Sequence, residues 1–445
     1  MATDAQPSAG PPGPAVSGLA ALRRFRRDPI GLLEEAATYG DVSALRLPRF
    51  PIFLLNHPDL VREVLVGSNR AFRKGPTMQA AKRMIGDSLL TTEGEEHRRQ
   101  RRLIQPLFHH ERIAGYADDM VELADRTADG WRDGQPLDAH AEMGRLTLAV
   151  VSRTLFGTDL PAGESRAIAG ALSGTLAQFD RVFSPLLPIT ERLPLPATRR
   201  FRAAHETFDR LVYGLIERRR AEGATGDDLL SMLLRAQEAG AGMTDTQVRD
   251  EAITLFLAGH ETTSNALTWA WYLLAQHLDV RRSWHAELDE VLGDRPPAAE
   301  DLERLTLTDA VLHEAIRLYP PGWAMGRTAL EVHRTGGFEI PAGATVVVSP
   351  WLLHRDARWF PDPLAFRPER WPAGPEPRHA YVPFGAGPRM CIGEPFAWME
   401  AALLLATIGR RWELDLSPDA RVELQPVVTL RPRYGMAMIA RRRAA

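Results

Sequence analysis

FGAGPRMCIG, residues 384–393, contains Cys391, the only cysteine among 445 residues. Three glycines accompany this cysteine and allow tight turns and the close approach of a bulky group: Gly385, Gly387 and Gly393. Pro395 suits the first turn of a helix, and a thiolate just before a helix N-terminus gains from amide donors and the helix dipole. Arg389 adds a nearby positive charge. The loop is therefore typical of a stabilised thiolate.

The chemistry of a single thiolate narrows the choice of ligand. A lone cysteine is most often a small buried hydrophobe, which remains the alternative. A metal bound by protein alone normally needs several ligands, and Cys391 has no second cysteine to join it. Haem brings four nitrogen ligands of its own, so that one thiolate is enough.

The decapeptide resembles the haem-binding signature of the cytochrome P-450 family, F-x-x-G-x-R-x-C-x-G. Five residues match at fixed spacing: Phe384, Gly387, Arg389, Cys391 and Gly393. The resemblance extends over about residues 25–440 and implies a haem-thiolate monooxygenase of the soluble bacterial type, with haem b ligated by Cys391. It also implies a mainly α fold with small β-sheets, in which the haem is buried between two central helices. Gly385 belongs to the same cofactor-binding loop.

The pattern along the chain favours one large, mainly helical domain. Residues 42–55 look like two short strands broken by prolines, and residues 343–350 look like another strand. Thr244 and Gln247 have capping-box spacing before an apolar run at 252–278, which predicts a buried helix.

The remaining segments complete this division of the chain. The helix ending at Tyr319 is stopped by two prolines, and residues 355–390 are expected to be irregular. The Pro/Gly/Ala-rich start predicts a disordered leader over residues 1–20 and one domain over 21–445.

Composition excludes several classes of function. The formal net charge of -3 provides no general basic field for nucleic acid. No apolar run reaches the ~18 residues of a membrane span, and one cysteine cannot form an internal disulfide. We expect a cytoplasmic monomer without a membrane anchor.

Two further blocks match the family. Glu314 and Arg317 are spaced i,i+3 among apolar residues, which indicates a buried pair where a surface ion pair is the alternative. The pair resembles the family's E-x-x-R motif, and Arg370 matches the third member of that structural network. His97 and Arg101, four residues apart, match a pair that contacts the haem propionates; a solvated basic face is the alternative.

The resemblance assigns two more propionate contacts and an oxygen-binding segment. Arg327 and Arg389 match the family's other two propionate partners. Several cationic partners are needed, because buried carboxylates must be paired. AGHETT, residues 258–263, resembles the oxygen-binding motif, in which Ala258 and Gly259 face the cofactor. Gly259 would leave room for dioxygen.

Two residues of AGHETT are implied to be catalytic. The hydroxyl of Thr262 would hold a proton near the bound oxygen, and Glu261 would help to relay protons from solvent. A single polar stripe facing solvent is the alternative. His260 receives no role.

The resemblance also implies which residues surround the substrate. By alignment to the family, seven residues should line its pocket: Leu90, Phe179, Phe183, Gly322, Trp323, Ala324 and Val428. These residues carry no charge, which favours a hydrophobic molecule. A terpenoid secondary metabolite is the first hypothesis, and a fatty acid or polyketide is the alternative.

We expect the electrons to come from a separate protein, because the chain leaves no room for a flavin module and one cysteine cannot bind an iron–sulfur cluster. We expect a ferredoxin and a ferredoxin reductase that pass electrons from NAD(P)H. Arg98, Arg99 and Arg102 are candidates for the docking face, and a solvated helix face is the alternative. A peroxide-driven peroxygenase and a non-catalytic haem sensor are the rival functions; Glu261 and Thr262 argue against both.

Overall fold

The computed structural model describes residues 10–443 apart from 17, 47–50, 160, 162, 165–166, 169, 172–192, 194, 227, 239–242 and 375–376. The chain forms two compact units that alternate along the sequence. Unit 1 comprises the chain up to Gln79, Gly322–Ala365 and Ala373–Cys391. Unit 2 comprises Ala80–Pro321, Phe366–Pro372 and the chain from Ile392.

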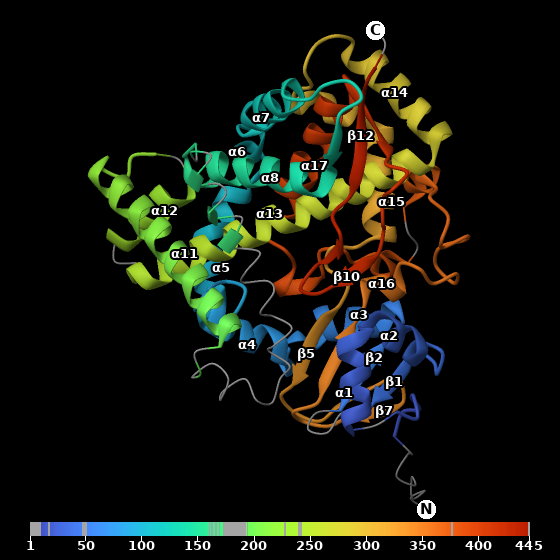
Figure 1. The fold of residues 1–445 in the computed structure, drawn as a ribbon. Coiled ribbons are helices and arrows are strands. Elements are labelled where there is room, and N and C mark those ends of the chain that lie inside the picture. Colours follow the sequence, from blue (N-terminus) through green and yellow to red (C-terminus); the bar gives the residue numbers. More distant parts are fainter. Residues whose placement is uncertain are drawn as a thin grey trace, which may run out of the picture. The chain divides into compact units, whose positions relative to one another are not determined.

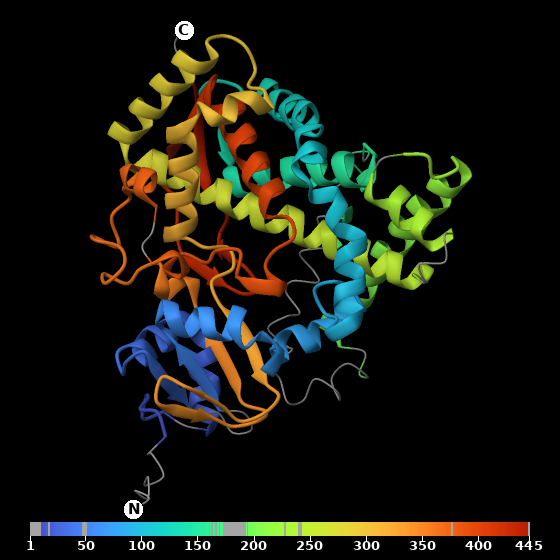
Figure 2. The same ribbon diagram turned by 180° about the vertical axis from the view of Figure 1, so that it is seen from behind.

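A five-stranded sheet forms the centre of unit 1 and joins two distant parts of the sequence. Its strand order is β1 (Val42–Leu45), β2 (Ile52–Leu55), β8 (Thr345–Val348), β5 (Met325–Ala329) and β3 (Phe72–Lys74). β2 and β8 run parallel, with Leu54 opposite Val347, and the other pairs are antiparallel. Figure 2 shows the blue N-terminal strands beside the orange strands from residues 325–348. The strands expected within 42–55 and 343–350 are therefore present.

Short helices and one hairpin complete unit 1: α1 (Gly18–Arg27), α2 (Pro29–Ala37), α3 (Pro58–Arg62), α16 (Pro350–Leu353), β6 (His333–Thr335) and β7 (Phe338–Ile340). α1 begins within the expected leader, and the Pro12 carbonyl accepts a hydrogen bond from Ala44 N at 2.8 Å. The leader predicted for residues 1–20 is therefore too long at its C-terminal end, because proline and glycine content alone does not show which backbone groups find partners. Residues 1–9 lie outside the described residues.

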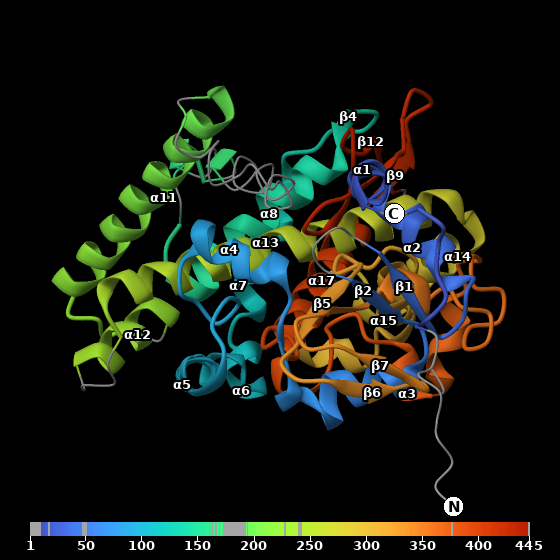
Figure 3. The ribbon, with the colours of Figure 1, turned by 90° about the horizontal axis from the view of Figure 1, so that it is seen from below.

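Unit 2 is built around α13 (Asp245–Gln276), with α8 (Ala139–Phe156), α15 (Thr306–Leu318) and α17 (Glu394–Gly409) packed against it (Figure 1). α11 (Pro196–Ala221) and α12 (Leu229–Glu238) pack against each other and both contact α13 (Figure 3). The other helices are α4 (Pro76–Ile85, which begins in unit 1), α5 (Gly94–Ile104), α6 (His110–Ala114), α7 (Ala117–Asp129) and α14 (Leu278–Leu292). A sheet of β4 (Pro136–Asp138), β12 (Ala437–Arg442) and β9 (Trp412–Leu416) and a hairpin of β10 (Leu424–Pro426) and β11 (Leu430–Pro432) complete the unit.

The helix ends follow local sequence signals. Thr244 Oγ1 accepts from Gln247 N at 3.2 Å and Thr244 N donates to Gln247 Oε1 at 3.0 Å, so the predicted capping box starts α13. α15 ends at Leu318, with Tyr319 as its C-cap, before the two prolines. Among the described residues from 355 to 390, only short 3-10 turns occur. The expectation of a mainly helical fold with small sheets is confirmed.

None of the helices in the described part of the chain combines the length and the hydropathy that a membrane span requires.

Candidate active site

The loop around Cys391 in unit 1 is built on two left-handed glycines. Gly385 has φ of 74° and Gly387 has φ of 71°, a region that residues with a Cβ rarely adopt. Cys391 N donates to Phe384 O at 3.0 Å, which closes the loop on itself. Cys391 itself is exposed. A loop fixed in this way, with an exposed thiol, would suit a cysteine ligand to haem iron.

Gly387→Ala should destabilise unit 1 more than a matched glycine substitution elsewhere in that unit. A Cβ at Gly387 would lie 2.2 Å from the Leu65 carbonyl oxygen, so that the loop or the backbone at Leu65 must move. Overpacking of this kind costs about 1–3 kcal/mol, in addition to the strain of a positive φ. Gly343→Ala is the control, because Gly343 has φ of 81° but nothing within 4 Å of the added Cβ. Equal losses of unfolding free energy in the two variants would contradict the packing argument.

Two arginines of unit 1 make hydrogen bonds to backbone carbonyls. Arg389 donates to Asn69 O at 3.1 Å and to Phe72 O at 3.0 Å, which ties the cysteine loop to the start of β3 and to the residues just before it. Arg327, on β5, is 8% exposed and donates to Gly326 O at 3.0 Å. Their contact with haem propionates stays a prediction. Two more of the predicted cofactor-binding residues are partly buried: Phe384 and Gly393, which is the N-cap of α17.

α5 of unit 2 carries the second predicted propionate pair. His97 is buried and Arg101 is half-buried, and their spacing of four puts both on one side of the helix. Arg98 and Arg99 pair with acidic residues one turn earlier in the same helix, Glu95 and Glu96.

Glu314 is the centre of a buried polar cluster in unit 2. Glu314 and Arg317 have fully buried side chains, and two bonds of 2.8 Å join them. Arg370 Nε donates to Glu314 Oε1 at 3.1 Å. The structure thus brings together the three residues that the sequence analysis grouped, and the alternative of a surface ion pair is excluded.

Two further donors in this cluster were missed by the sequence analysis. Arg367 N donates to Glu314 Oε1 at 2.9 Å, and Trp371 Nε1 donates to Glu314 Oε2 at 2.9 Å. Both flank Arg370, so the position of Arg370 in the sequence was a usable signal. Glu314 therefore holds two parts of the structure in place: the Arg317 side chain and the segment of residues 367–371.

The middle of α13 presents one short uncovered stripe. Between Val248 and Trp271, all residues are buried except Ala258, Gly259 and Thr262. These three lie within one turn, on a helix that is covered elsewhere along this stretch. Small side chains and one hydroxyl on such a stripe suit the approach of a flat cofactor and a small molecule. Thr262 Oγ1 donates to Ala258 O at 2.6 Å.

Gly259 has a packing role that the sequence analysis did not predict. A Cβ at this position would lie 2.8 Å from Val151 Cγ2 of α8. The absence of a side chain therefore permits the close contact between α13 and α8.

Glu261 is buried and bonded to the β10–β11 hairpin. Its Oε1 accepts from Thr429 Oγ1 at 3.0 Å and lies 3.8 Å from Arg431 Nη1. Asn265, one turn further along α13, donates to Thr429 Oγ1 at 3.2 Å. No sequence signal pointed to these partners, because Thr429 lies far along the chain. Glu261 is thus fixed by contacts on the hairpin, which constrains how it can carry a proton.

His260 should make the stability of the protein sensitive to mild acid. Burial lowers the pKa of His260 to about 4 from its ordinary value of 6.5, with His140 acting in the same direction and Glu261 in the opposite one. Between these two values the unfolded chain binds the proton and the folded chain does not, so stability falls as pH drops from about 6.5 to about 4.

Denaturant unfolding at several pH values would test this dependence. His260→Gln should have a shallower decline in unfolding free energy over that range than wild type. His110→Gln, at the exposed start of α6, is the control and should keep the wild-type slope. An unchanged slope in His260→Gln would contradict the assignment.

The expected pocket residues are divided among several places. Leu90, before α5, and Val428, before β11, are half-buried in unit 2. Trp323 is buried in unit 1, where its carbonyl accepts from Ser349 Oγ at 2.8 Å, and Gly322 and Ala324 beside it are half-buried. The other two lie outside the described residues: Phe179 and Phe183.

Comparison with known proteins gives the same assignment over most of the chain. The family Cytochrome P450 matches residues 7–436. Cyclooctatin synthase of Streptomyces melanosporofaciens is 39% identical over 94% of this chain and 92% of its own length. Cyclooctat-9-en-7-ol 5-monooxygenase of the same species is 38% identical over 94% and 93%. Pentalenene oxygenase of Streptomyces avermitilis is 34% identical over 92% and 91%.

A solved structure shows the same fold. The crystal structure of CYP175A1 from Thermus thermophilus matches with a TM-score of 0.76 at 30% identity, over 94% of this chain and 97% of its own. The resemblance seen in the cysteine loop is therefore confirmed along both units. The chain belongs to the cytochrome P450 family and is a monooxygenase of that family.

Proposed function

We propose that this monooxygenase inserts one oxygen atom of O2 into a terpenoid hydrocarbon or alcohol. The observation that carries the proposal is the set of relatives named for cyclooctatin, cyclooctat-9-en-7-ol and pentalenene, which are similar over more than nine-tenths of the chain. The uncharged residues expected around the pocket support it, because such a pocket favours an apolar molecule.

The cofactor of the family is haem bound through a cysteine thiolate, and Cys391 is the only cysteine. When bound, haem would activate O2, with electron density supplied by the thiolate. By the family resemblance, Arg327, Arg389, His97 and Arg101 would bind the two propionates. Buried carboxylates need such cationic partners.

Thr262 and Glu261 would move protons in different ways. The hydroxyl of Thr262, on the uncovered stripe, donates to Ala258 O. By rotating away from that carbonyl, it can donate its proton to another group and accept a new proton. The side chain of Glu261 projects from α13 in a direction about 100° around the helix axis from that of Thr262. Because Thr429 donates to Glu261, this carboxylate must rotate or use a water molecule to pass a proton to Thr262. Glu261 would therefore receive protons on the side of the β10–β11 hairpin. Thr262 Oγ1 would hold the proton that is finally donated at the uncovered stripe.

Thr262→Ala should lower product formation on the order of 10²-fold and divert oxygen to hydrogen peroxide. The matched control is Thr268→Ala on the same helix, because Thr268 Oγ1 makes the same kind of bond, to Ser264 O at 2.6 Å, but is fully buried. Product and peroxide should be measured per NAD(P)H oxidised. If both variants uncouple equally, the hydroxyl of Thr262 has only a structural role.

A ferredoxin with its reductase would supply the electrons. Of the three arginines expected at a docking face, Arg98 and Arg99 have acidic partners within α5, while Arg102 is exposed. Local neutralisation weakens the attraction of these two for an acidic protein. A solvated helix face is therefore the favoured assignment for Arg98 and Arg99.

The test is a panel of candidate substrates added to the oxidised holoenzyme: pentalenene, a C12 fatty acid and a macrolide lactone. We expect a substrate-type shift of the Soret band with pentalenene alone. Product should form with NADPH, ferredoxin and ferredoxin reductase, and not with peroxide alone. A shift and turnover only with the fatty acid or the macrolide would replace the terpenoid assignment. Turnover with peroxide alone would make the enzyme a peroxygenase.

A further inference from the structure

Two buried carboxylates of α13 accept backbone N–H groups from residues 86–92, which we call the clamped loop. Asp250 Oδ2 accepts from Asp87 N at 2.7 Å. Glu251 accepts from Leu89 N, at 2.9 Å to Oε1 and 3.1 Å to Oε2. Asp250 is 3% exposed and Glu251 is fully buried. Bonds from amides to carboxylates are charge-assisted and roughly twice as strong as neutral ones, so the main chain of the loop is tied firmly to α13.

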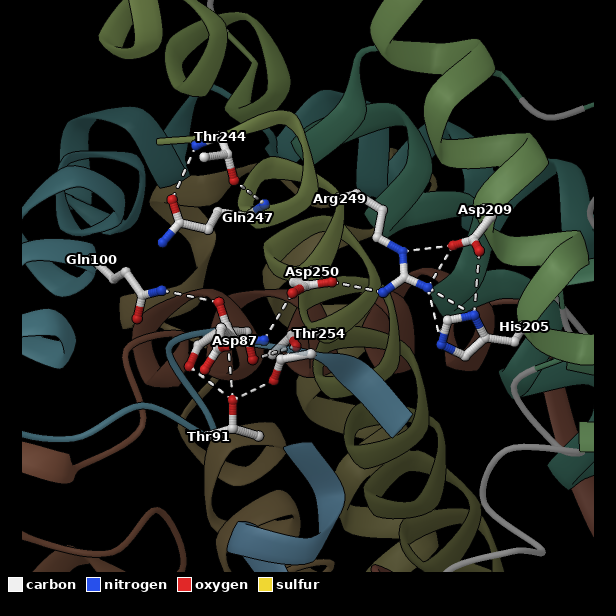
Figure 4. Close-up of polar contacts among 12 residues, drawn as sticks. Asp87, Thr91, Gln100, His205, Asp209, Thr244, Gln247, Arg249, Asp250 and Thr254 are labelled. Carbon is white, nitrogen blue, oxygen red and sulfur yellow. Dashed lines mark hydrogen bonds and ion pairs between the residues drawn. The ribbon is translucent and has the colours of Figure 1, made fainter. Parts of the chain in front are cut away.

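Side-chain bonds and one glycine define the conformation of the clamped loop further. Thr91 Oγ1 donates to Gly86 O at 2.7 Å, and Thr254 Oγ1 of α13 donates to Ser88 Oγ at 2.7 Å (Figure 4). Gly86 has φ of 71°, and an added Cβ there would lie 1.9 Å from Asp250 Oδ2. The close approach of the Asp250 carboxylate therefore depends on the absence of a side chain at residue 86.

The other carboxylate oxygen of Asp250 accepts from a side chain that also contacts α11. Arg249 Nη1 donates to Asp250 Oδ1 at 2.6 Å, and Arg249 Nε donates to Asp209 Oδ1 of α11 at 2.6 Å. Arg249 Nη2 also lies 2.9 Å from His205 Nδ1 of α11. Figure 4 shows these contacts as one continuous path from α11, through Arg249 and Asp250, to the clamped loop at Asp87.

A contribution to stability alone does not account for this arrangement. Arg249 and Asp250 are both buried, and the cost of removing two charges from water largely offsets their attraction. Apolar residues of similar volume could pack α11 against α13 at a similar free energy, but they would leave the N–H group of Asp87 without its acceptor. The charges also fix the orientation of the Asp250 carboxylate, because one of its oxygens accepts from Asp87 N and the other from Arg249.

We propose that Asp250 is a positioning residue that sets the conformation of the clamped loop, and that Arg249 makes this conformation depend on the position of α11. The clamped loop carries Leu90, so the network shapes the substrate pocket without touching the substrate. This second part rests on the assignment of Leu90 to the pocket in the proposed function. Asp250 is thus a determinant of which molecules fit.

Three substitutions of aspartate by asparagine separate the parts of the proposal. Asp250→Asn keeps the shape but has only one acceptor oxygen, so it must lose Asp87 N or face Arg249 with an N–H group. Asp209→Asn weakens the contact of α11 with Arg249 and leaves the bonds to the loop in place. Asp245→Asn is the control: Asp245 is also on α13 and binds Arg220 of α11 at 3.0 Å, but it contacts neither Arg249 nor the clamped loop.

The first measurement is hydrogen–deuterium exchange of peptides that cover residues 86–93 in the holoenzyme. Loss of one charge-assisted bond should accelerate exchange roughly 10- to 100-fold in Asp250→Asn. Asp209→Asn should produce part of this acceleration, and should add nothing in the Asp250→Asn background, because the two act along one path. Asp245→Asn should leave the peptides as in wild type. Protection that is unchanged in Asp209→Asn would overturn the dependence on α11, and Asp209→Asn still provides this test if Asp250→Asn fails to fold.

The second measurement is the ratio of the affinities of 4-phenylimidazole and imidazole, followed by the Soret band. Both bind the same iron, so their ratio reports the shape of the pocket and needs no knowledge of the natural substrate. We expect the ratio to change on the order of fivefold in Asp250→Asn, because apolar contacts of the phenyl ring depend on the loop. Asp245→Asn should keep the wild-type ratio. Faster exchange with an unchanged ratio would overturn the role in the pocket, whereas failure of the terpenoid panel would leave both measurements valid.

Discussion

Glu314→Ala should lower the free energy of unfolding by about 3–5 kcal/mol, because it leaves the fully buried Arg317 guanidinium without its carboxylate. The expected loss is large because Glu314 also accepts from Arg370, Arg367 N and Trp371 Nε1. Removal of this one carboxylate thus takes a hydrogen-bond acceptor from four donor groups at once. Chemical denaturation measures the change, and the haem-to-protein ratio of the purified variant should fall with it.

Glu339→Ala is the control for Glu314→Ala, because Glu339 also pairs with an arginine but is 54% exposed. An exposed ion pair contributes only about 0–1 kcal/mol. If Glu314→Ala lost no more stability than Glu339→Ala, the buried cluster would not be holding residues 367–371.

Cys391→Ser should abolish monooxygenase activity while the protein still folds. The side chain of Cys391 is exposed, so exchange of sulfur for oxygen leaves no cavity. Serine does not provide a thiolate, and no other cysteine can replace it. The reduced variant with carbon monoxide should therefore lack the strongly red-shifted Soret band of a thiolate-ligated haem.

Met390→Leu is the control for Cys391→Ser, since it changes the neighbouring residue at nearly constant volume. This variant should keep the red-shifted band and the activity. Persistence of the band in Cys391→Ser would show that another group ligates the iron.

Local signals were enough to predict the elements that carry the chemistry. Thr244 and Gln247 marked the start of α13, and the prolines after Tyr319 marked the end of α15. Both signals act within one helical turn, so they need no information about the rest of the fold. The spacing of Glu314 and Arg317 among apolar residues likewise indicated their burial.

Contacts between distant segments could not be predicted in this way. β4 has three residues and pairs with β12 near the end of the described chain, and a strand this short has little pattern of its own. Thr429 contacts Glu261, and Asp87 contacts Asp250, only because the fold brings their segments together. Asp250 and Glu251 were thus not identified as candidates, although two adjacent carboxylates at the start of an apolar run are an unusual feature.

The sheet of unit 1 also constrains how the protein is made. β2 cannot pair with β8 until the ribosome has synthesised Thr345–Val348, and the cysteine loop follows later still. Unit 1 therefore becomes complete only once Cys391 has been synthesised, and unit 2 only once β12 has been synthesised. During translation β2 keeps one edge free, and such an edge invites aggregation. Cys391 thus becomes available only late in synthesis, and chaperones that shield the growing N-terminal region should raise the yield of holoenzyme.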